Sequence, residues 1–182
     1  MSLFDAGTGR LLRSFGEYPS AYRQGHSFLG SVGFLRVIQE GNFIYLMYPH
    51  QSLIEQYDWE GTLRARFSLP ESTHRDTQFK VSHQPLERLS RKELDALKND
   101  AYIGGFAKVL GQPVFYYSFY SHKSQKIYLC RYDTEQQAFS EVALPPMASF
   151  IYLFPQAQAH RVSFLSTSSQ SDELFIYEIR LD

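Results

Sequence analysis

Histidines are the residues of this sequence best suited to chemistry, because imidazole binds metals and titrates near neutral pH. Five of the six histidines fall in polar, turn-rich segments, where loops are expected, and no pair shows a local ligand spacing such as His-x-x-x-His. Two interpretations stay open: a metal or acid–base site assembled from loops, or polar residues gathered in the longest loops. The five are His26, His50, His74, His83 and His122.

Other residues point to ligand binding rather than to catalysis. Arg36 stands within an expected strand, where its guanidinium can bind an anion, or can pair with a carboxylate or backbone carbonyls. Tyr22 and other tyrosines suit a sugar or peptide groove, or packing with the hydroxyl in water. No catalytic or metal-binding residue is predicted, since no Gly-x-Ser-x-Gly motif or phosphate-binding glycine loop occurs. The predicted ligand-binding set is Arg36, His26, His50, Arg75, His83, His122 and Tyr22.

Composition narrows the classes of partner. Lys and Arg number 18 against 19 Asp and Glu, and this net charge of −1 gives no electrostatic case for nucleic acid. The lone Cys130 excludes an intrachain disulfide and a thiolate-rich zinc site. No apolar run approaches the length of a transmembrane helix, and no signal peptide is expected at the start. We therefore expect a protein or a small molecule as the partner, and no cofactor unless the histidines hold a divalent metal.

The elements that must position these residues are expected to be strands. Aromatic residues make up 16% of the 182 residues, and aromatic side chains pack well on pleated surfaces. The predicted strand Asn42–Tyr48 is apolar on both faces, which indicates that its sheet has neighbours on both sides. The predicted strand Leu63–Leu69 instead alternates apolar residues with Arg64, Arg66 and Ser68, as an outer edge strand does.

A repeat organises these strands. An Asp closes the third strand of each unit, at Asp5, Asp58, Asp133 and Asp182. Once an insertion at 71–100 is removed, the period is near about fifty residues, which is typical of β-propeller blades with four antiparallel strands. Ser90-Arg91-Lys92-Glu93 fits a capping box, so the insertion is expected to contain a short helix near Arg91–Lys98.

The chain is therefore predicted to be all-β, a single propeller unit over 1–182 with roughly three blades. Propellers usually have about four to eight blades, so this half-propeller needs a complement. Three arrangements are open: half of a longer propeller, a homodimer that exchanges end strands to close a six-bladed ring, or an open stack covered by other subunits.

Two stretches, FDAGTGRLLRSFG and IYLMYPHQSLIEQYDWEGTLRARF, resemble blades of the NHL and TolB-like six-bladed propellers. Those blades carry an Ile-Tyr-hydrophobic strand, a strand that ends in Asp, a Gly turn, and a strand that ends in Phe. The sequence differs from this family pattern at Tyr48-Pro49-His50, where those blades usually have an Asp and a turn that bears an Arg. The resemblance covers most of the chain except 71–100. It implies binding or scaffolding most often, with some hydrolases and lyases, and export or a periplasmic location in bacterial relatives.

Two functions follow as expectations. The first is a non-enzymatic module that binds a ligand or protein at the face where the longer loops gather, with the insertion supplying specificity. The second is a hydrolase or lyase with a metal at the channel mouth, held by residues such as His50 and His122. In both, the loop-rich face is formed by the links between blades and the turns between second and third strands.

Overall fold

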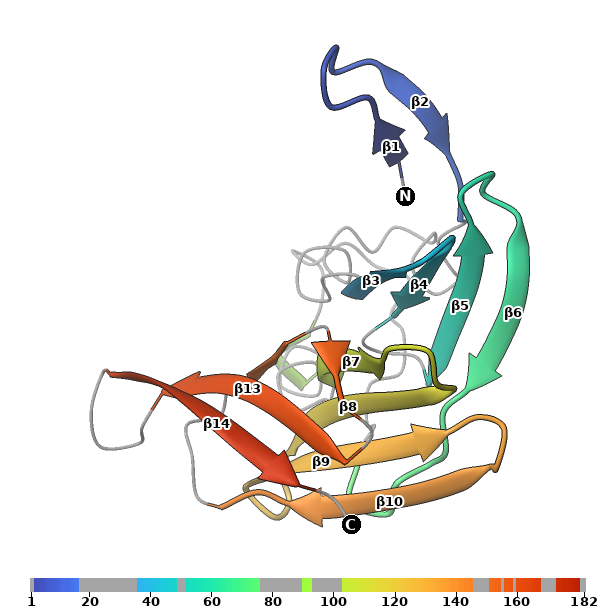
Figure 1. The fold of residues 1–182 in the computed structure, drawn as a ribbon. Helices are drawn as coiled ribbons and strands as arrows, with labels where there is room; N and C mark the ends of the chain where they lie inside the picture. Colours follow the sequence, from blue (N-terminus) through green and yellow to red (C-terminus); the bar gives the residue numbers. More distant parts are fainter. Residues whose placement is uncertain are drawn as a thin grey trace.

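The structure, a computed structural model, describes residues 2–16, 36–48, 52–75, 90–92, 103–145, 151–154, 156–158, 160–167 and 173–180. Within these residues the chain forms fourteen strands in four sheets, as the all-β prediction expected (Figure 1). Of the predicted helix, only Arg91 and Lys92 are described, and both are helical after Ser90. The remainder of that prediction lies outside the described residues.

The strands pair largely with their neighbours in sequence. A first hairpin contains β1 (Ser2–Phe4) and β2 (Leu11–Ser14). The next sheet has the order β3-β4-β5-β6, with β3 Arg36–Glu40, β4 Phe43–Met47, β5 Leu53–Asp58 and β6 Leu63–Ser68. All of these pairings are antiparallel, and β6 lies at the sheet edge, as its alternating sequence predicts.

The third sheet is the largest. Its order is β10-β9-β8-β7-β12, with β7 Ile103–Val109, β8 Val114–Ser121, β9 Lys126–Asp133, β10 Ala138–Ala143 and β12 Gln156–Ala157. The last sheet has the order β11-β13-β14, with β11 Ile151–Leu153, β13 Arg161–Thr167 and β14 Leu174–Arg180. Gln156 and Ala157 pair in parallel with the edge of β7 that β8 leaves free.

The sheets stack through three apolar layers, and β4 shows why. Tyr45 and Met47 face the core shared with the β7–β10 sheet. Ile44 and Leu46 face the opposite way, against Phe15 after the first hairpin. Because neighbouring side chains of a strand alternate between faces, two-sided apolar sequence requires two-sided packing. The prediction that this sheet has neighbours on both sides is confirmed.

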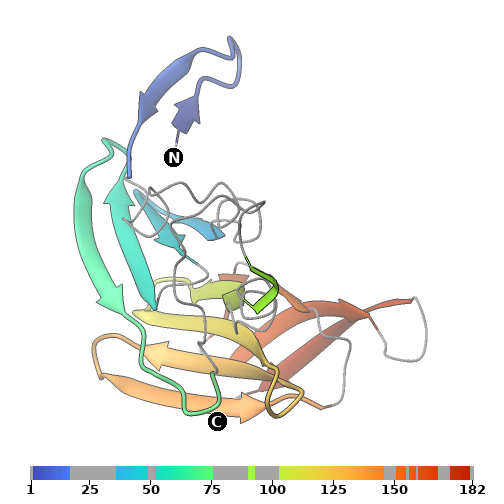
Figure 2. The ribbon, with the colours of Figure 1, turned by 180° about the vertical axis from the view of Figure 1, so that it is seen from behind.

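The third layer lies between the β7–β10 sheet and the last sheet, and its buried members include Leu129, Leu153 and Phe164. Among the first strands of the sheets, β7 contacts both β3 and β11 on the inner side. The outer strands β6 and β10 lie at the rim (Figures 1 and 2). The described sheets fan around this inner side, and they do not close into a ring.

Equivalent aspartates shape the turns before the outer strands. The Asp5 carboxylate accepts from the Thr8 amide at 2.7 Å, and Asp58 accepts from the Thr62 amide at 2.8 Å. Asp133 accepts from the Gln136 amide at 2.9 Å. Such side chain to backbone bonds are the reason that Asp favours turns. The fourth predicted position, Asp182, lies outside the described residues.

Candidate functional site

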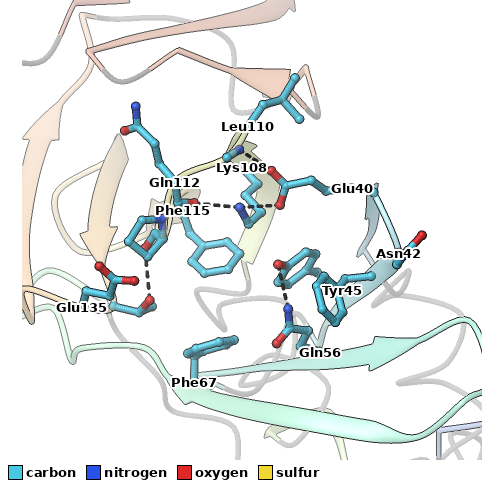
Figure 3. Close-up of a pocket in the computed structure, with 15 residues that line it drawn as sticks. Glu40, Asn42, Tyr45, Gln56, Phe67, Lys108, Leu110, Gln112, Phe115 and Glu135 are labelled. Carbon is cyan, nitrogen blue, oxygen red and sulfur yellow. Dashed lines mark hydrogen bonds and ion pairs between the residues drawn. The ribbon is translucent and has the colours of Figure 1, made fainter.

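A groove of ≈ 820 Å³ lies between the β3–β6 sheet and the β7–β10 sheet (Figure 3). Its walls come from the ends of strands and from the tight turns β3–β4, β7–β8 and β9–β10. Because stacked twisted sheets diverge toward their ends, side chains there do not fill all the space between them. The lining residues are Glu40, Gly41, Asn42, Phe43, Tyr45, Gln56, Phe67, Lys108, Leu110, Gly111, Gln112, Pro113, Phe115, Thr134 and Glu135.

A buried ion pair holds the two sheets together beside this groove. The Lys108 ammonium on β7 lies 2.6 Å from the Glu40 carboxylate on β3. It also donates to the backbone carbonyls of Gln112 at 2.7 Å and Val109 at 3.1 Å. Glu40 in turn accepts from the Gly111 amide at 2.5 Å. A buried ammonium needs such partners because the apolar surroundings do not solvate its charge.

The groove has an aromatic floor. The ring centroid of Phe115 lies 5.5 Å from that of Tyr45 and 5.7 Å from that of Phe67. The Lys108 ammonium stands 5.2 Å from the Tyr45 centroid and 5.6 Å from the Phe115 centroid, which adds cation–π attraction. Above the floor, the side chains of Phe43 and Leu110 are exposed to solvent. Phe43 and Leu110 therefore offer apolar surface to a ligand, and Figure 3 shows Phe115, Phe67 and Tyr45 gathered around the same space.

Tyr45 carries a polar group in this floor. Its hydroxyl accepts a hydrogen bond from the Gln56 side-chain amide at 2.9 Å. Burial raises the pKa of Tyr45, the nearby Glu40 carboxylate adds to this effect, and together they bring it to about 12. The phenol therefore stays protonated near neutral pH and acts as a hydrogen-bonding group.

The charges around the groove do not balance. Glu40 and Lys108 neutralise each other, whereas Glu135 on the β9–β10 turn is exposed. The formal charge of the lining residues is therefore one negative unit. An apolar floor with a negative rim favours a ligand that combines a large apolar group with a positive charge.

None of the residues predicted from sequence to bind a ligand lines this groove. It lies at the tight turns between first and second strands and between third and fourth strands, which is the end opposite to the predicted loop-rich face. The signal that was available is Lys108, the single charged residue in the strand Ile103–Val109. A charge inside an apolar strand needs a partner from another element, and here that partner is Glu40, 68 positions earlier in the chain.

Arg36 is the first residue of β3, within a strand as predicted. Its Nε donates to the backbone carbonyl of Gly104 on β7 at 2.9 Å, which is the carbonyl pairing considered from sequence. Together with Gly105 and Tyr152 it borders a smaller cavity of ≈ 290 Å³. The anion-binding role of Arg36 stays a prediction.

The other predicted site residues lie apart from the groove. Arg75 donates from Nη1 to the Ser52 hydroxyl at 2.8 Å, so the link after β6 does meet the β4–β5 turn. The His122 ring, on the β8–β9 turn, lies edge-on to Tyr120 with centroids 4.9 Å apart. Arg36, Arg75 and His122 therefore contact three different sets of residues. The remaining predicted residues, His26, His50, His83 and Tyr22, lie outside the described residues.

Metal-ligating residues do not cluster in the described part of the chain: no three His, Cys, Asp or Glu side chains lie close enough to hold an ion. His74 stacks on Tyr128 with ring centroids 4.5 Å apart, and its Nε2 lies 3.7 Å from Glu141. Cys130 is fully buried, and burial raises the pKa of its thiol. That thiol is therefore protonated and shielded, as expected for a structural cysteine.

No protein-family model matches the chain, and no curated protein is significantly similar to it. Within the described residues, no helix has the length and apolar character needed to span a membrane.

Proposed function

We propose that this chain is a non-enzymatic binding module of the NHL or TolB-like propeller type, and that it binds a segment of a partner protein in the groove between its two four-stranded units. The propeller assignment is supported by the outward strand order, by the contacts of β7 with the neighbouring first strands β3 and β11, and by the equivalent aspartate turns at Asp5, Asp58 and Asp133. In this assignment β3–β6 and β7–β10 are complete blades.

The aromatic floor beside a satisfied ion pair is the observation that carries the binding proposal. Binding grooves are mostly apolar, with a few fixed polar groups that set orientation. Phe43 and Leu110 supply exposed apolar surface beside Phe67, and the side chains of Gln56 and Gln112 supply polar groups. Glu135 adds the negative rim. The ligand that fits is an extended peptide with one large apolar side chain next to a basic residue.

The test uses four acetylated and amidated peptides of defined sequence: Gly-Trp-Lys-Gly, Gly-Trp-Glu-Gly, Gly-Ala-Lys-Gly and Gly-Ala-Glu-Gly. Binding is followed by amide chemical shifts of the labelled chain. We expect shifts at Gly111 and Glu135 with the Trp-Lys peptide, and at least tenfold weaker binding of both Ala peptides. Replacing Lys by Glu turns attraction to Glu135 into repulsion; at about 0.5 kcal/mol for each, the change is worth about 1 kcal/mol, so the Trp-Glu peptide should bind about fivefold more weakly than Trp-Lys.

Matched variants separate the groove from non-specific apolar contact. Phe43 borders the groove and Leu63 does not, yet both side chains are 37% exposed. Phe43→Ser should weaken binding of the Trp-Lys peptide at least threefold, whereas Leu63→Ser should leave it unchanged. Equal loss in both variants, or no shift of any groove amide at millimolar peptide, would overturn the proposal.

A further inference from the structure

The smaller cavity beside Arg36 lies where strands of three sheets meet. It has a volume of ≈ 290 Å³ and shares no lining residue with the groove between the two complete sheets. β3 contributes Arg36 and Val37 to its wall, β7 contributes 104–106, and β11 contributes Tyr152 and Leu153. Small-molecule sites usually measure about 300–1,000 Å³, so this cavity suits a ligand at the small end of that class.

A β-bulge in β7 positions the charged side chain of this cavity. The register between β7 and β8 shifts between Ile103 and Gly105, so Gly104 is an extra residue with no residue opposite it on β8. Bulges are frequent beside functional sites, because they interrupt the ladder and re-aim the groups around them. The Gly104 carbonyl accepts a hydrogen bond from Arg36 Nε on β3 at 2.9 Å. The bulge therefore holds the Arg36 guanidinium at the cavity.

The two glycines at this bulge shape the wall in different ways. A Cβ on Gly105 would lie 2.6 Å from Leu153 Cγ, so glycine at this position lets β11 approach β7 closely. A Cβ on Gly104 would have no atom within 4 Å, so the space beside Gly104 is open. Gly104 does not have a positive φ, so its backbone can accept another residue without strain. A larger side chain at this position should therefore reduce the open volume of the cavity.

The cavity wall favours a negatively charged ligand group. Among the described residues that line the cavity, Arg36 alone is charged. A guanidinium presents its N–H donors in a planar fork that matches the two oxygens of a carboxylate. The Gly104 carbonyl uses Nε–H, and a carboxylate accepts from two N–H groups, so it can bind beside other partners of this side chain.

The remainder of the wall favours an apolar ligand body. Phe106 and Leu153 are buried, whereas Val37 and Tyr152 are 44% and 46% exposed. The Tyr152 ring lies edge-on to Phe154, with ring centroids 6.3 Å apart, and this contact limits its rotation. A flat apolar group can therefore pack against Tyr152 while its negative group meets the guanidinium.

We infer that this cavity binds a small organic carboxylate with a flat apolar body, and that Arg36 recognises the carboxylate. The inference concerns a different site from the peptide groove and does not depend on it. Benzoate is the simplest probe of this ligand class. Benzamide is its neutral counterpart of nearly the same shape, and inorganic phosphate is an anion without an apolar body.

Titration of the labelled full chain with the three probes tests the inference. At millimolar benzoate we expect shifts of the Gly104 and Gly105 amide resonances and of the Arg36 Nε–H resonance. Benzamide should bind at least tenfold more weakly, because hydrogen bonds to a charged group are stronger than those to a neutral one. Phosphate should also bind at least tenfold more weakly, because it has no apolar body to pack against Tyr152.

Two variants change the cavity in independent ways. Arg36→Gln removes the charge, whereas Gly104→Val fills open space and keeps the charge, and each should weaken benzoate binding at least tenfold. Arg13→Gln is the matched control, because Arg13 is an exposed arginine on β2 and its loss changes the charge of the chain equally. Benzoate binding should be unchanged in this control. Unshifted amide resonances outside the cavity show that each variant is folded.

Three results would overturn the carboxylate site: no shift at Gly104 or Gly105 with millimolar benzoate, equal binding of benzoate with benzamide or phosphate, or benzoate binding that both cavity variants retain. The Trp-Lys peptide is titrated into the same samples, because the groove and the cavity share no lining residue. A chain that binds the peptide but not benzoate would refute only the cavity site. A chain that binds benzoate but not the peptide would refute only the groove as a binding site.

Discussion

Removing the ammonium of Lys108 tests whether the ion pair beside the groove ties the two complete sheets together. Lys108→Met keeps the length and apolar stem of the side chain but deletes the charge. Glu40 would then keep the Gly111 amide but lose its cation, and the carbonyls of Gln112 and Val109 would lose a donor. The change therefore isolates the polar contribution of one side chain.

The magnitude follows from burial. Breaking a fully buried pair costs about 3–5 kcal/mol, because the remaining charge is left without a partner. The Lys108 side chain is 5% exposed but the Glu40 side chain is 17% exposed, so water reaches Glu40 in part. We therefore expect the free energy of unfolding to fall by about 2–3 kcal/mol in Lys108→Met, measured by urea denaturation with linear extrapolation.

A double-mutant cycle separates the pair from the packing. Glu40→Gln should cost about 1–2 kcal/mol, because Lys108 keeps its two carbonyl acceptors. The combined variant should be more stable than the sum of the single costs implies, with a coupling of at least about 1 kcal/mol. A Lys108→Met chain within about 0.5 kcal/mol of wild type, or strictly additive costs, would refute the reasoning.

Three further perturbations follow from the structure. Gly61 has φ +79°, and a Cβ there would lie 2.8 Å from Phe15 Cβ, so Gly61→Ala should lower the free energy of unfolding by about 2 kcal/mol. Gly41 has φ +53° with open space around it, so Gly41→Ala should lower the free energy of unfolding by only about 1 kcal/mol. Equal losses of the two variants in urea denaturation would contradict the clash with Phe15. The pKa of Tyr45 is raised from 10 to about 12, so the contribution of this phenol to stability is complete below pH 10 and is lost as the pH rises toward 12. Between pH 10 and pH 12 the free energy of unfolding should therefore fall less steeply in Tyr45→Phe than in wild type. Parallel curves of unfolding free energy against pH would contradict the raised pKa. Cys130 is buried, and burial raises the pKa of its thiol. Ellman's reagent at pH 8 should therefore react with the native chain at least a hundredfold more slowly than with the unfolded chain. Comparable reaction rates would contradict the burial of Cys130.

Sheet formation could be predicted from local pattern. The alternation in β6 and the two-sided apolar sequence of β4 depend only on the period of two in a strand, so edge position and two-sided packing follow without tertiary information. The aspartate turns were predictable for the same reason, since each bond joins residues at most four positions apart.

The candidate site could not be predicted in this way. The residues predicted from sequence are mostly histidines in loops, whereas the groove is made by residues that become neighbours only when two sheets stack. Tyr45 and Phe115 belong to different sheets, and their ring contact depends on the angle between those sheets. Only Lys108 carried a local signal, as a charge in an apolar strand, and the signal did not name its partner.

The amino-acid sequence by itself determines which residues of this protein form strands, which face of each strand is apolar, and where aspartate turns reverse the chain, because these depend on contacts over a few residues. Tertiary structure alone decides that Glu40 meets Lys108, that an aromatic-floored groove opens beside them, and that the hairpin and β14 are left exposed at opposite ends. These features depend on how whole sheets stack, and the same strand pattern is compatible with more than one stacking order and twist.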